Sequence, residues 1–288
     1  MDPRPIAMFD SGFGGLTVAR AVIDLLPGED LVYLGDTARY PYGPRPLDEV
    51  RGFATQITRH LLAEHEAKLV VVACNTASAA ALDHLTEMVD VPVIGVIEPG
   101  ARSLVAATRT GRIGVIGTVG TVASGAYQQA VGAVVAGGSP PSTNASTVPD
   151  DVDEVTLTCA ACPGFVEFVE RGETDSDQVR VLAERLLAPV REAGVDTLLL
   201  GCTHYPYLAR TIGDVMGREV VLVSSADETG FAVRARLEAD DALAPPRDRP
   251  ATHRFASTGD TTWFRDLGRR LLGPELAHVE HVDLGTSA

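Results

Sequence analysis

Two cysteines are the side chains of this 288-residue sequence best suited to chemistry, because each stands between an aliphatic run and a polar pair. Cys74 follows three valines and an alanine and is followed by Asn-Thr, whereas Cys202 follows three leucines and a glycine and is followed by Thr-His. A free thiol has a pKa of about 8.5, so modest help from its surroundings brings the thiolate within reach at neutral pH. Two thiols in such similar surroundings could act on one ligand from opposite sides.

Each cysteine is predicted to lie where a strand ends and a helix begins. The aliphatic run before it has the length and composition of a strand buried on both faces, as in a parallel sheet. The residues after it, 77–88 and 206–216, have helical composition, and Pro206 suits a first helical turn. Ligands bind at this edge of an open α/β sheet, and backbone N–H groups at a helix start favour a thiolate. The alternative for either cysteine is a small buried apolar residue.

The rest of the chain alternates between short aliphatic runs and amphipathic segments, which predicts an α/β fold with mainly parallel sheets, in two lobes rather than one. Residues 133–153, rich in Gly, Pro, Ser, Thr and Asp, are predicted to be a flexible excursion. Residues 39–44 contain two prolines and a glycine and are predicted to form an ordered loop over the sheet edge. We predict strands at 5–9, 31–34, 70–72, 93–96, 112–116, 155–158, 197–200, 219–223, 254–257 and 277–282, and the longer helices at 16–26, 47–66, 77–88, 162–170, 176–193, 206–216, 227–238 and 261–272.

The composition argues against several classes of protein. A hydrophobic content of 45% over 288 residues is enough for one or two domains with real cores. The net charge of −15 disfavours binding to the phosphate backbone of nucleic acids, and no basic run offsets it. No apolar stretch approaches membrane-spanning length and the first residues carry no signal-peptide pattern, so we expect a cytoplasmic protein without membrane contact. In that compartment the four cysteines are expected to be thiols.

The pair Cys159-x-x-Cys162 could instead be half of a zinc or redox site. A zinc site needs four ligands, and neither a second such pair nor a pair of histidines accompanies this one. His278 and His281 lie near the end of the sequence, apart from any cysteine along the chain. We therefore expect no metal.

Four motifs that include both cysteines follow one another along the chain, at residues 10–15, 35–43, 73–78 and 201–206. They are Asp-Ser-Gly-Phe-Gly-Gly, Gly-Asp-Thr-Ala-Arg-Tyr-Pro-Tyr-Gly, Ala-Cys-Asn-Thr-Ala-Ser and Gly-Cys-Thr-His-Tyr-Pro. With these motifs the sequence resembles glutamate racemase, of the Asp/Glu racemase superfamily, from about Ile6 to its C-terminal tail. The motifs are independent of one another and match in order and spacing, so the resemblance is specific.

The resemblance implies two pseudo-symmetric α/β lobes with the active site in the cleft between them. One lobe would hold residues 1–97 and 210–288 and carry Cys74. The other would hold residues 98–209 and carry Cys202.

The resemblance also implies an activity. The family interconverts L- and D-glutamate without pyridoxal phosphate, metal or nucleotide, and supplies D-glutamate for peptidoglycan, and so for cell-wall biogenesis and cell shape. Homodimers are usual, and some relatives contact DNA gyrase. This sequence departs from the family pattern at 133–153, which looks like an insertion in the second lobe, and at Gly164 and Glu167. Neither departure touches the cysteine motifs.

Racemising an amino acid means removing the α-hydrogen from one face and returning a proton to the other, so two bases that face each other are the direct solution. Such a pair must hold one thiolate and one thiol, and their titrations are coupled. By resemblance, Cys74 takes the proton from D-glutamate and Cys202 takes it from L-glutamate. The α-hydrogen is far less acidic than a thiol, so the remaining barrier must be lowered by preorganised hydrogen-bond donors.

Each thiol needs a group that receives or steers its proton. Asp10, at the end of the first predicted strand, is the candidate beside Cys74. His204, two positions after Cys202, and Glu170, aligned with a carboxylate of the family's second lobe, are the candidates on the other side. The alternatives are a turn residue for Asp10 and a solvated helix glutamate for Glu170.

Donors at the strand-to-helix turns are expected to hold the substrate. Thr118 and Thr121 fit a carboxylate-binding turn on physical grounds, with simple helix capping as the alternative. The resemblance implies substrate contacts for Asp10, Ser11, Tyr42, Gly43, Asn75, Thr76, Thr203 and His204.

Other functions fit parts of the sequence. Residues 12–15 follow a predicted strand like a dinucleotide-binding loop, but Thr17 stands at the third glycine position and Asp10 would face the phosphate. The same cysteine pair could racemise aspartate or another carbon acid. A protein that only binds a partner is disfavoured by two intact cysteines. The chemistry outlined above needs no cofactor.

Overall fold

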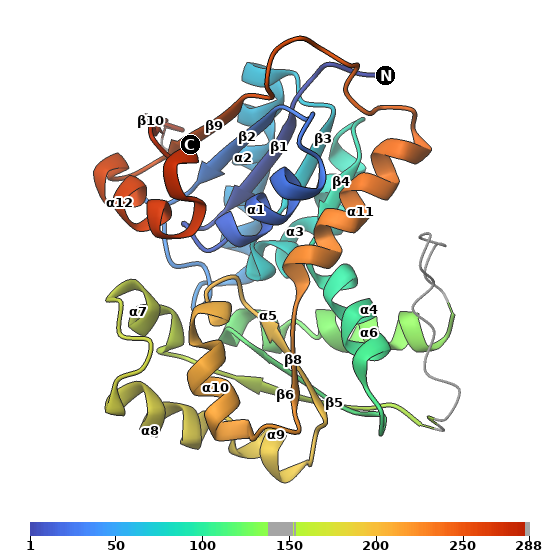
Figure 1. The fold of residues 1–288 in the computed structure, drawn as a ribbon, viewed down its shortest axis with the longest axis vertical. Coiled ribbons are helices and arrows are strands. Elements are labelled where there is room, and N and C mark those ends of the chain that lie inside the picture. Colours follow the sequence, from blue (N-terminus) through green and yellow to red (C-terminus); the bar gives the residue numbers. More distant parts are fainter. Residues whose placement is uncertain (138–151, 153, 286–288) are drawn as a thin grey trace. The chain divides into compact units, whose positions relative to one another are not determined.

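The computed structural model describes residues 1–137, 152 and 154–285 (Figure 1). The chain forms two compact units: unit 1 comprises Met1–Val96 and Thr229–Ala288, and unit 2 comprises Ile97–Glu228. Each unit is a parallel β-sheet with helices packed on it, which confirms the predicted α/β class with mainly parallel sheets. In the described part of the chain, no helix is both long enough and apolar enough to cross a membrane.

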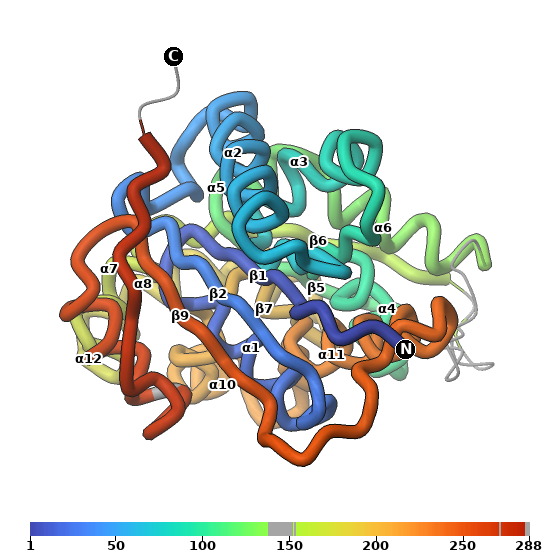
Figure 2. Tube along the Cα trace, turned by 90° about the horizontal axis from the view of Figure 1, so that it is seen from above, coloured from blue at the N-terminus to red at the C-terminus, as the bar shows by residue number. Residues whose placement is uncertain are grey.

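Unit 1 is built on a six-stranded sheet in the order β10-β9-β2-β1-β3-β4, in which every neighbouring pair is parallel. The central strands β1, β2 and β3 are buried along their whole length, as expected for aliphatic strands covered on both faces. Figure 2 shows β9, β2 and β1 running side by side. The strands are β1 Ile6–Asp10, β2 Leu31–Gly35, β3 Leu69–Val72, β4 Val93–Gly95, β9 His253–Ser257 and β10 Glu280–His281.

Helices cover both faces of this sheet. The helices α2 and α3 pack against each other and against the face formed by Ala7, Phe9 and Val72. On the other face Tyr33 packs against Phe264 of α12, with ring centroids 6.1 Å apart. The helices of unit 1 are α1 Leu16–Leu25, α2 Leu47–His65, α3 Asn75–Met88, α12 Thr261–Leu272, the 3-10 helix η2 Gly273–Glu275 and the larger part of α11 Ser225–Ala239.

Unit 2 is built on a four-stranded parallel sheet in the order β6-β5-β7-β8. The helix α4 packs on α6 and on the strands β7 and β8, whereas α8 packs on α10. The strands are β5 Arg112–Gly117, β6 Thr156–Ala161, β7 Thr197–Gly201 and β8 Val221–Ser224. The helices are α4 Ile97–Ala107, α5 Val119–Ala123, α6 Ala126–Val135, α7 Phe165–Glu170, α8 Asp177–Leu186, α9 Ala188–Glu192, the 3-10 helix η1 Tyr205–Leu208 and α10 Ala209–Met216.

The two sheets repeat one strand order, and this repeat gives the two cysteines equivalent positions. The order β2-β1-β3-β4 in unit 1 matches the order β6-β5-β7-β8 in unit 2. Cys74 follows the end of β3, and Cys202 follows the end of β7, which is the matching strand. The carboxyl ends of β3 in unit 1 and of β7 in unit 2 therefore each carry a thiol.

Two predicted helices of unit 2 are wrong in detail. The single helix predicted at 176–193 is interrupted, because α8 ends at Leu186 and α9 begins at Ala188 with Pro189 in its first turn. A proline has no N–H group to continue the ladder of α8. The helix predicted at 206–216 starts as a 3-10 turn and becomes α-helical only at Ala209.

The second boundary between the two parts of the chain also differs from the prediction. Residues 210–228 were expected in the lobe of Cys74, but they belong to unit 2, because β8 pairs with β7 and α10 packs on α8. The chain returns to unit 1 only inside α11. The helix α6 extends to Val135, into the excursion predicted at 133–153, of which 138–151 and 153 lie outside the described residues.

Candidate active site

Cys74 stands at the start of α3 in unit 1. It is the N-cap residue of that helix, it has an extended backbone, and it is buried. Its Sγ donates to Oγ of Ser11 over 3.8 Å. Because β1 and β3 are neighbouring strands, the turn that carries Ser11 lies beside the turn that carries Cys74. The first motif of the sequence and the first cysteine motif therefore meet at one edge of the sheet.

The surroundings of Cys74 oppose ionisation of its thiol. Burial, followed by the negative charge of Asp10, raises the pKa of Cys74 to about 12. The backbone N–H groups of Ala77 and Ser11 and the hydroxyl of Ser11 lower the pKa, but they do not offset the burial. The N–H groups of this turn favour the thiolate, as predicted, but burial outweighs them and the net shift of the pKa is upward.

Asp10 is the last residue of β1, and the backbone of the following turn holds its carboxylate. Its Oδ2 accepts hydrogen bonds from the N–H groups of Gly12 at 3.3 Å and Gly15 at 2.9 Å. Gly15 approaches closely, since a Cβ added to it would lie 2.7 Å from Cβ of Asp10. Oδ1 of Asp10 is buried and accepts no hydrogen bond from the residues that the structure describes. A buried carboxylate oxygen without a donor is costly, which favours a functional role over that of a turn residue.

Tyr42 and Gly43 are buried in the loop between β2 and α2. The hydroxyl of Tyr42 donates a short hydrogen bond to Oδ2 of Asp36. Burial, and after it the charge of the Asp36 carboxylate, raises the pKa of Tyr42 well above its ordinary value. The charge of Cys74 contributes to the same shift, so the phenol lies near the thiol. Tyr42 is therefore a neutral phenol near this thiol, and its one O–H proton is donated to Asp36.

Asn75 and Thr76 form the first turn of α3 and are buried. N–H groups in the first turn of a helix have no partner within the helix, and they suit an anionic ligand group. Ser78, two residues after Thr76, fixes this turn. Its Oγ donates to the carbonyl of Val72 at 2.9 Å and accepts from the N–H of Val96 at 3.3 Å. The helix start is therefore held firmly on the end of β3.

Cys202 directly follows β7 in unit 2, and it is buried together with Thr203 and His204. Its Sγ lies 4.0 Å from Nδ1 of His204. Nε2 of His204 faces Oε1 of Glu170, the last residue of α7, over 3.8 Å. A thiol, an imidazole and a carboxylate from two separate elements thus lie in sequence at separations of 4.0 and 3.8 Å, the second of which is longer than a hydrogen bond. In such an arrangement the imidazole can exchange a proton with the sulfur while the carboxylate orients the ring.

Thr118 and Thr121 form the turn after β5, which lies beside the turn of Cys202 because Gly117 pairs with Gly201 in the sheet. Oγ of Thr118 accepts from the N–H of Thr121 at 3.3 Å, and the two hydroxyl oxygens lie 2.9 Å apart. Thr118 therefore caps α5, which is the alternative that the sequence left open. Two hydroxyls next to the second thiol also suit a carboxylate, and substrate binding by this turn stays a prediction.

The sequence gives no sign of Tyr127 and assigns Asp36 no part in this site. Tyr127 of α6 is fully buried, and burial followed by the charges of Cys202 and Cys159 raises its pKa. The phenol therefore lies near the second thiol, where helix packing places it. Asp36 was detectable, because it lies in the motif that also contains Tyr42.

The Cys159-x-x-Cys162 pair shows no sign of special chemistry. Burial raises the pKa of Cys159 to about 11 and the pKa of Cys162 to about 12. Both thiols are free. Among the described residues, no group of three His, Cys, Asp or Glu side chains could hold a metal ion. We assign the pair a structural role at the end of β6.

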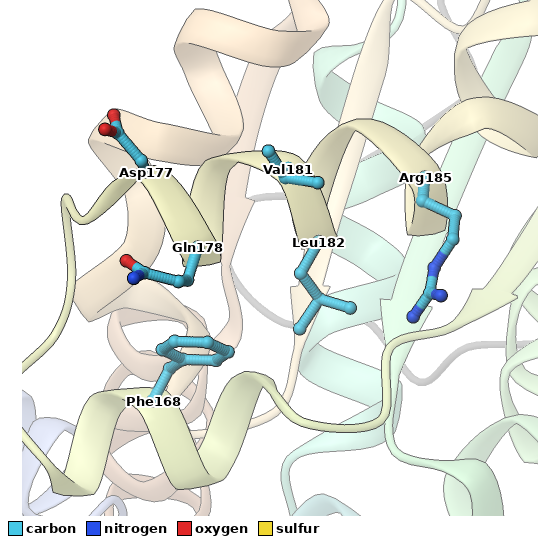
Figure 3. A pocket seen from close by; sticks show the side chains of 6 residues that line it. All are labelled: Phe168, Asp177, Gln178, Val181, Leu182 and Arg185. Atoms are coloured by element: carbon cyan, nitrogen blue, oxygen red, sulfur yellow. The ribbon is translucent and has the colours of Figure 1, made fainter.

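A hollow of about 540 Å³ lies between α7 and α8 of unit 2 (Figure 3). None of the residues predicted for the site lines it. Three of its six side chains are apolar and none is a cysteine or a histidine, so we assign no chemistry to it. The lining consists of Phe168, Asp177, Gln178, Val181, Leu182 and Arg185.

Each unit therefore assembles its own set of candidate residues around one cysteine. Each set contains a thiol, a carboxylate near the sulfur or its imidazole, and hydroxyl or N–H donors at the ends of neighbouring strands. The set of unit 1 is Asp10, Ser11, Tyr42, Gly43, Cys74, Asn75 and Thr76, and that of unit 2 is Thr118, Thr121, Glu170, Cys202, Thr203 and His204.

Known proteins are similar to this chain in sequence and in fold. The model of the Asp/Glu/hydantoin racemase family matches residues 16–228. The chain is 50% identical to a glutamate racemase of Acidothermus cellulolyticus over 275 residues, which are 96% of this chain and 97% of the relative. The crystal structure of glutamate racemase isoform RacE1 from Bacillus anthracis matches all of both chains with 38% identity and a TM-score of 0.88. The glutamate racemase of Francisella tularensis, in complex with D-glutamate, matches 99% of each chain with 32% identity and a TM-score of 0.84. This chain belongs to the Asp/Glu/hydantoin racemase family and, within it, to the glutamate racemases.

Proposed function

We propose that this protein interconverts L- and D-glutamate by proton transfer between two cysteine thiols and the α-carbon, without a cofactor. The observation that carries the proposal is the repeated strand order, which gives each unit one buried thiol at an equivalent strand end with its own proton-handling group. The names of the relatives support glutamate as the substrate.

The two thiols take opposite parts in each direction. Cys74 removes the α-proton of D-glutamate, and Cys202 then returns a proton to the other face to give L-glutamate. In the reverse direction the roles are exchanged. Each turnover therefore starts with one thiolate and one thiol and ends with the pair exchanged, and the two titrations are coupled.

Substrate binding is what makes the thiolate available. The pKa of Cys74 is raised to about 12 by burial and by the charge of Asp10. The ammonium group of glutamate brings a positive charge next to the sulfur, which favours the ionised thiol, and Oδ1 of Asp10 receives the proton that the thiol releases. The same ammonium group makes the α-hydrogen more acidic, so one interaction serves both partners of the proton transfer.

The substrate carboxylates need N–H and O–H donors that are fixed before binding, because donors that need not reorganise lower the barrier most. The first turn of α3, with Asn75 and Thr76, supplies such donors in unit 1. The hydroxyl of Tyr42 already donates to Asp36, so its oxygen can serve the substrate only as an acceptor for the ammonium group. Thr118 and Thr121 supply hydroxyls in unit 2. Substitution of these residues one at a time would test which of them binds each carboxylate of glutamate.

D-glutamate made in this way would enter peptidoglycan synthesis, and so cell-wall biogenesis and cell shape, from the cytoplasm. The net charge of −15 supports a protein that works on a small molecule and not on nucleic acid. We expect a homodimer, which sedimentation equilibrium would test. A contact with DNA gyrase, as in some relatives, would have to use the acidic protein surface, and a pull-down at low and high salt would test it.

The decisive experiment is incubation of each glutamate enantiomer in deuterated water with the wild type, Cys74→Ala and Cys202→Ala. The wild type should give product with solvent deuterium at Cα, and neither variant should racemise. Cys159→Ala is the matched control, because Cys159 is a thiol of β6 outside both candidate sets, and it should racemise like the wild type.

Racemisation by either site variant would refute the two-base mechanism. A requirement for added pyridoxal phosphate would refute the cofactor-free mechanism. A panel of single amino acids that includes aspartate would decide the substrate, and aspartate as the preferred substrate would refute glutamate.

A further inference from the structure

The loop that carries Tyr42 and Gly43 is organised by one buried carboxylate. Asp36 is fully buried, and its Oδ2 accepts both the hydroxyl of Tyr42 and Nε of Arg39, the latter at 2.7 Å. Its Oδ1 accepts the hydroxyl of Thr258 at 2.7 Å. The position of Tyr42 therefore depends on Asp36, and the position of Asp36 depends on two further side chains.

Gln56 of α2 extends this network away from the candidate site. Nη1 of Arg39 donates to Oε1 of Gln56 at 2.6 Å, and Nε2 of Gln56 donates to the carbonyl of Leu284 at 2.6 Å. The guanidinium carbon of Arg39 lies 4.3 Å above the ring centroid of Phe53. The ring of Phe53 in turn packs on the ring of Tyr42, with centroids 5.5 Å apart. The guanidinium group of Arg39 is thus held by the hydrogen bond from its Nη1 to Gln56 and by stacking on the ring of Phe53.

Leu284 belongs to residues 280–285, which we call the strap. The strap starts with β10, the edge strand next to β9, and the N–H of Val282 donates to the carbonyl of Ser257 at 3.0 Å. Val282 and Leu284 pack against the hydrophobic core cluster that also contains Tyr42 and Cys74. The strap is far from the loop in sequence, yet it shares both a hydrogen-bond network and a core with it.

We propose that Gln56 is a positioning residue that couples the strap to the substrate loop. The coupling runs from the carbonyl of Leu284 through Gln56, Arg39 and Asp36 to the hydroxyl of Tyr42. When the strap is docked, the loop is held in the form that presents Tyr42 and Gly43 to glutamate. The inference rests on the proposed function for the nature of the ligand, but the coupling itself concerns only unit 1.

Two variants break the coupling at different points. Gln56→Leu removes the side-chain hydrogen bonds to Arg39 and to the strap, and deletion of residues 284–288 removes the strap carbonyls that accept from Gln56. Deletion of residues 286–288 is the matched control, because it keeps the carbonyls of both Leu284 and Gly285, which lies 3.4 Å from Nε2 of Gln56. Gln56→Glu is a third variant that separates the two contacts of Gln56, because it keeps an acceptor for Arg39 and loses the donor to the strap.

The coupling variants should raise KM for both enantiomers about tenfold, because a loop that is competent only a tenth of the time weakens apparent binding by that factor. The fall in kcat should be smaller. A merely structural role would lower the amount of active enzyme, and so kcat, at unchanged KM. The control deletion should leave both constants unchanged, and Gln56→Glu should match the deletion of residues 284–288.

Hydrogen–deuterium exchange of residues 36–46 tests the coupling without any substrate. Faster exchange in both coupling variants, with α1 unchanged, supports the proposal, whereas unchanged exchange in the loop overturns it. Faster exchange with an unchanged KM overturns the link to substrate binding. Absence of glutamate racemisation in the wild type would refute the proposed function, and the exchange measurement would still decide the coupling.

Discussion

Nδ1 of His204 lies 4.0 Å from Sγ of Cys202, whereas the equivalent sulfur of the other unit, that of Cys74, lies 3.8 Å from the hydroxyl of Ser11. The repeated strand order thus presents two thiols with unlike neighbours. An imidazole backed by the carboxylate of Glu170 serves one of them, and a hydroxyl with the carboxylate of Asp10 nearby serves the other. This difference allows each half of the reaction to be perturbed separately.

Replacement of His204 by asparagine should lower kcat/KM by roughly 10²–10⁴-fold, the usual contribution of a positioned acid or base. The loss must be equal in both directions, because the two enantiomers have the same free energy. The step at Cys202 becomes the slow one, so α-deuterated L-glutamate should show a larger isotope effect than α-deuterated D-glutamate. Initial rates with labelled and unlabelled substrates measure this difference.

Glu170→Gln should have a weaker effect than His204→Asn, because Glu170 acts on the sulfur only through the imidazole. It should lower kcat/KM by a smaller factor. The isotope effect should again be larger with α-deuterated L-glutamate than with α-deuterated D-glutamate. Equal isotope effects with the two enantiomers in His204→Asn would contradict the pairing of His204 with Cys202.

Asp10→Asn should make the Cys74 thiol more acidic and yet lower the racemase activity. The charge of Asp10 is the second cause, after burial, of the raised pKa of Cys74, so its removal should lower that pKa. The pH midpoint for alkylation of Cys74 by iodoacetamide, read by peptide mass spectrometry, should therefore move to lower pH. Racemisation should nevertheless slow, because the variant loses the carboxylate that we propose receives the proton of Cys74. An unchanged or higher midpoint would contradict the assigned electrostatics.

Two glycine-to-alanine substitutions should have opposite effects on stability. In Gly15→Ala the new Cβ would meet Cβ of Asp10 at 2.7 Å and Cβ of Ala73 at 2.9 Å, so overpacking should cost about 1–3 kcal/mol and lower the activity. In Gly52→Ala, on α2, the new Cβ would meet nothing within 4 Å. That change should stabilise the protein by about 0.5–1 kcal/mol, since alanine favours a helix over glycine. Urea unfolding of both variants gives the comparison, and equal effects would refute the close approach at Gly15.

Lys68→Met should destabilise unit 1 strongly. Nζ of Lys68 lies 2.6 Å from Oε2 of Glu29, and both side chains are almost completely buried. Loss of one partner leaves a buried charge without its counter-ion, at a cost of about 3–5 kcal/mol. The same ammonium group also donates to the carbonyls of Asp2 and Ala242 at 2.8 Å each, so the chain segments around it should loosen as well. Unfolding in urea measures the loss.

The double variant Lys68→Met with Glu29→Leu is the control for that measurement. It removes both charges, so it should recover a large part of the stability that the single variant loses. A double variant as unstable as Lys68→Met would show that the effect comes from packing or from the carbonyl contacts and not from the stranded carboxylate.

The sequence was sufficient for features that depend on neighbours along the chain. The helix predicted at 261–272 has the bounds Thr261–Leu272 in the structure, where Asp260 caps its first turn and Gly273 follows its last residue. The strands that carry the site were predicted because valine and leucine runs end in glycine or small residues. The unit membership of β8 was not predictable, because it depends on pairing with β7, which nothing in the local sequence of β8 specifies.

The candidate residues came from motifs, but the electrostatics around them depend on the packed structure. Asp10, Cys74 and Cys202 were predicted from motifs at strand ends, and their roles in the reaction stay predictions. The direction of the pKa shift of Cys74 was missed, because burial is a property of the whole packed unit and outweighs the local N–H groups. Tyr127 was missed for the same reason, since it reaches the second thiol by helix packing.

The burial of Cys74 has a further consequence for the lifetime of the protein in an oxidising environment. Hydrogen peroxide attacks thiolates and hardly attacks thiols, and its first product is a sulfenic acid. A sulfur with a pKa of about 12 rests almost entirely as the thiol at neutral pH. In the free protein, before bound substrate makes the thiolate available, this sulfur is therefore in its least oxidisable form.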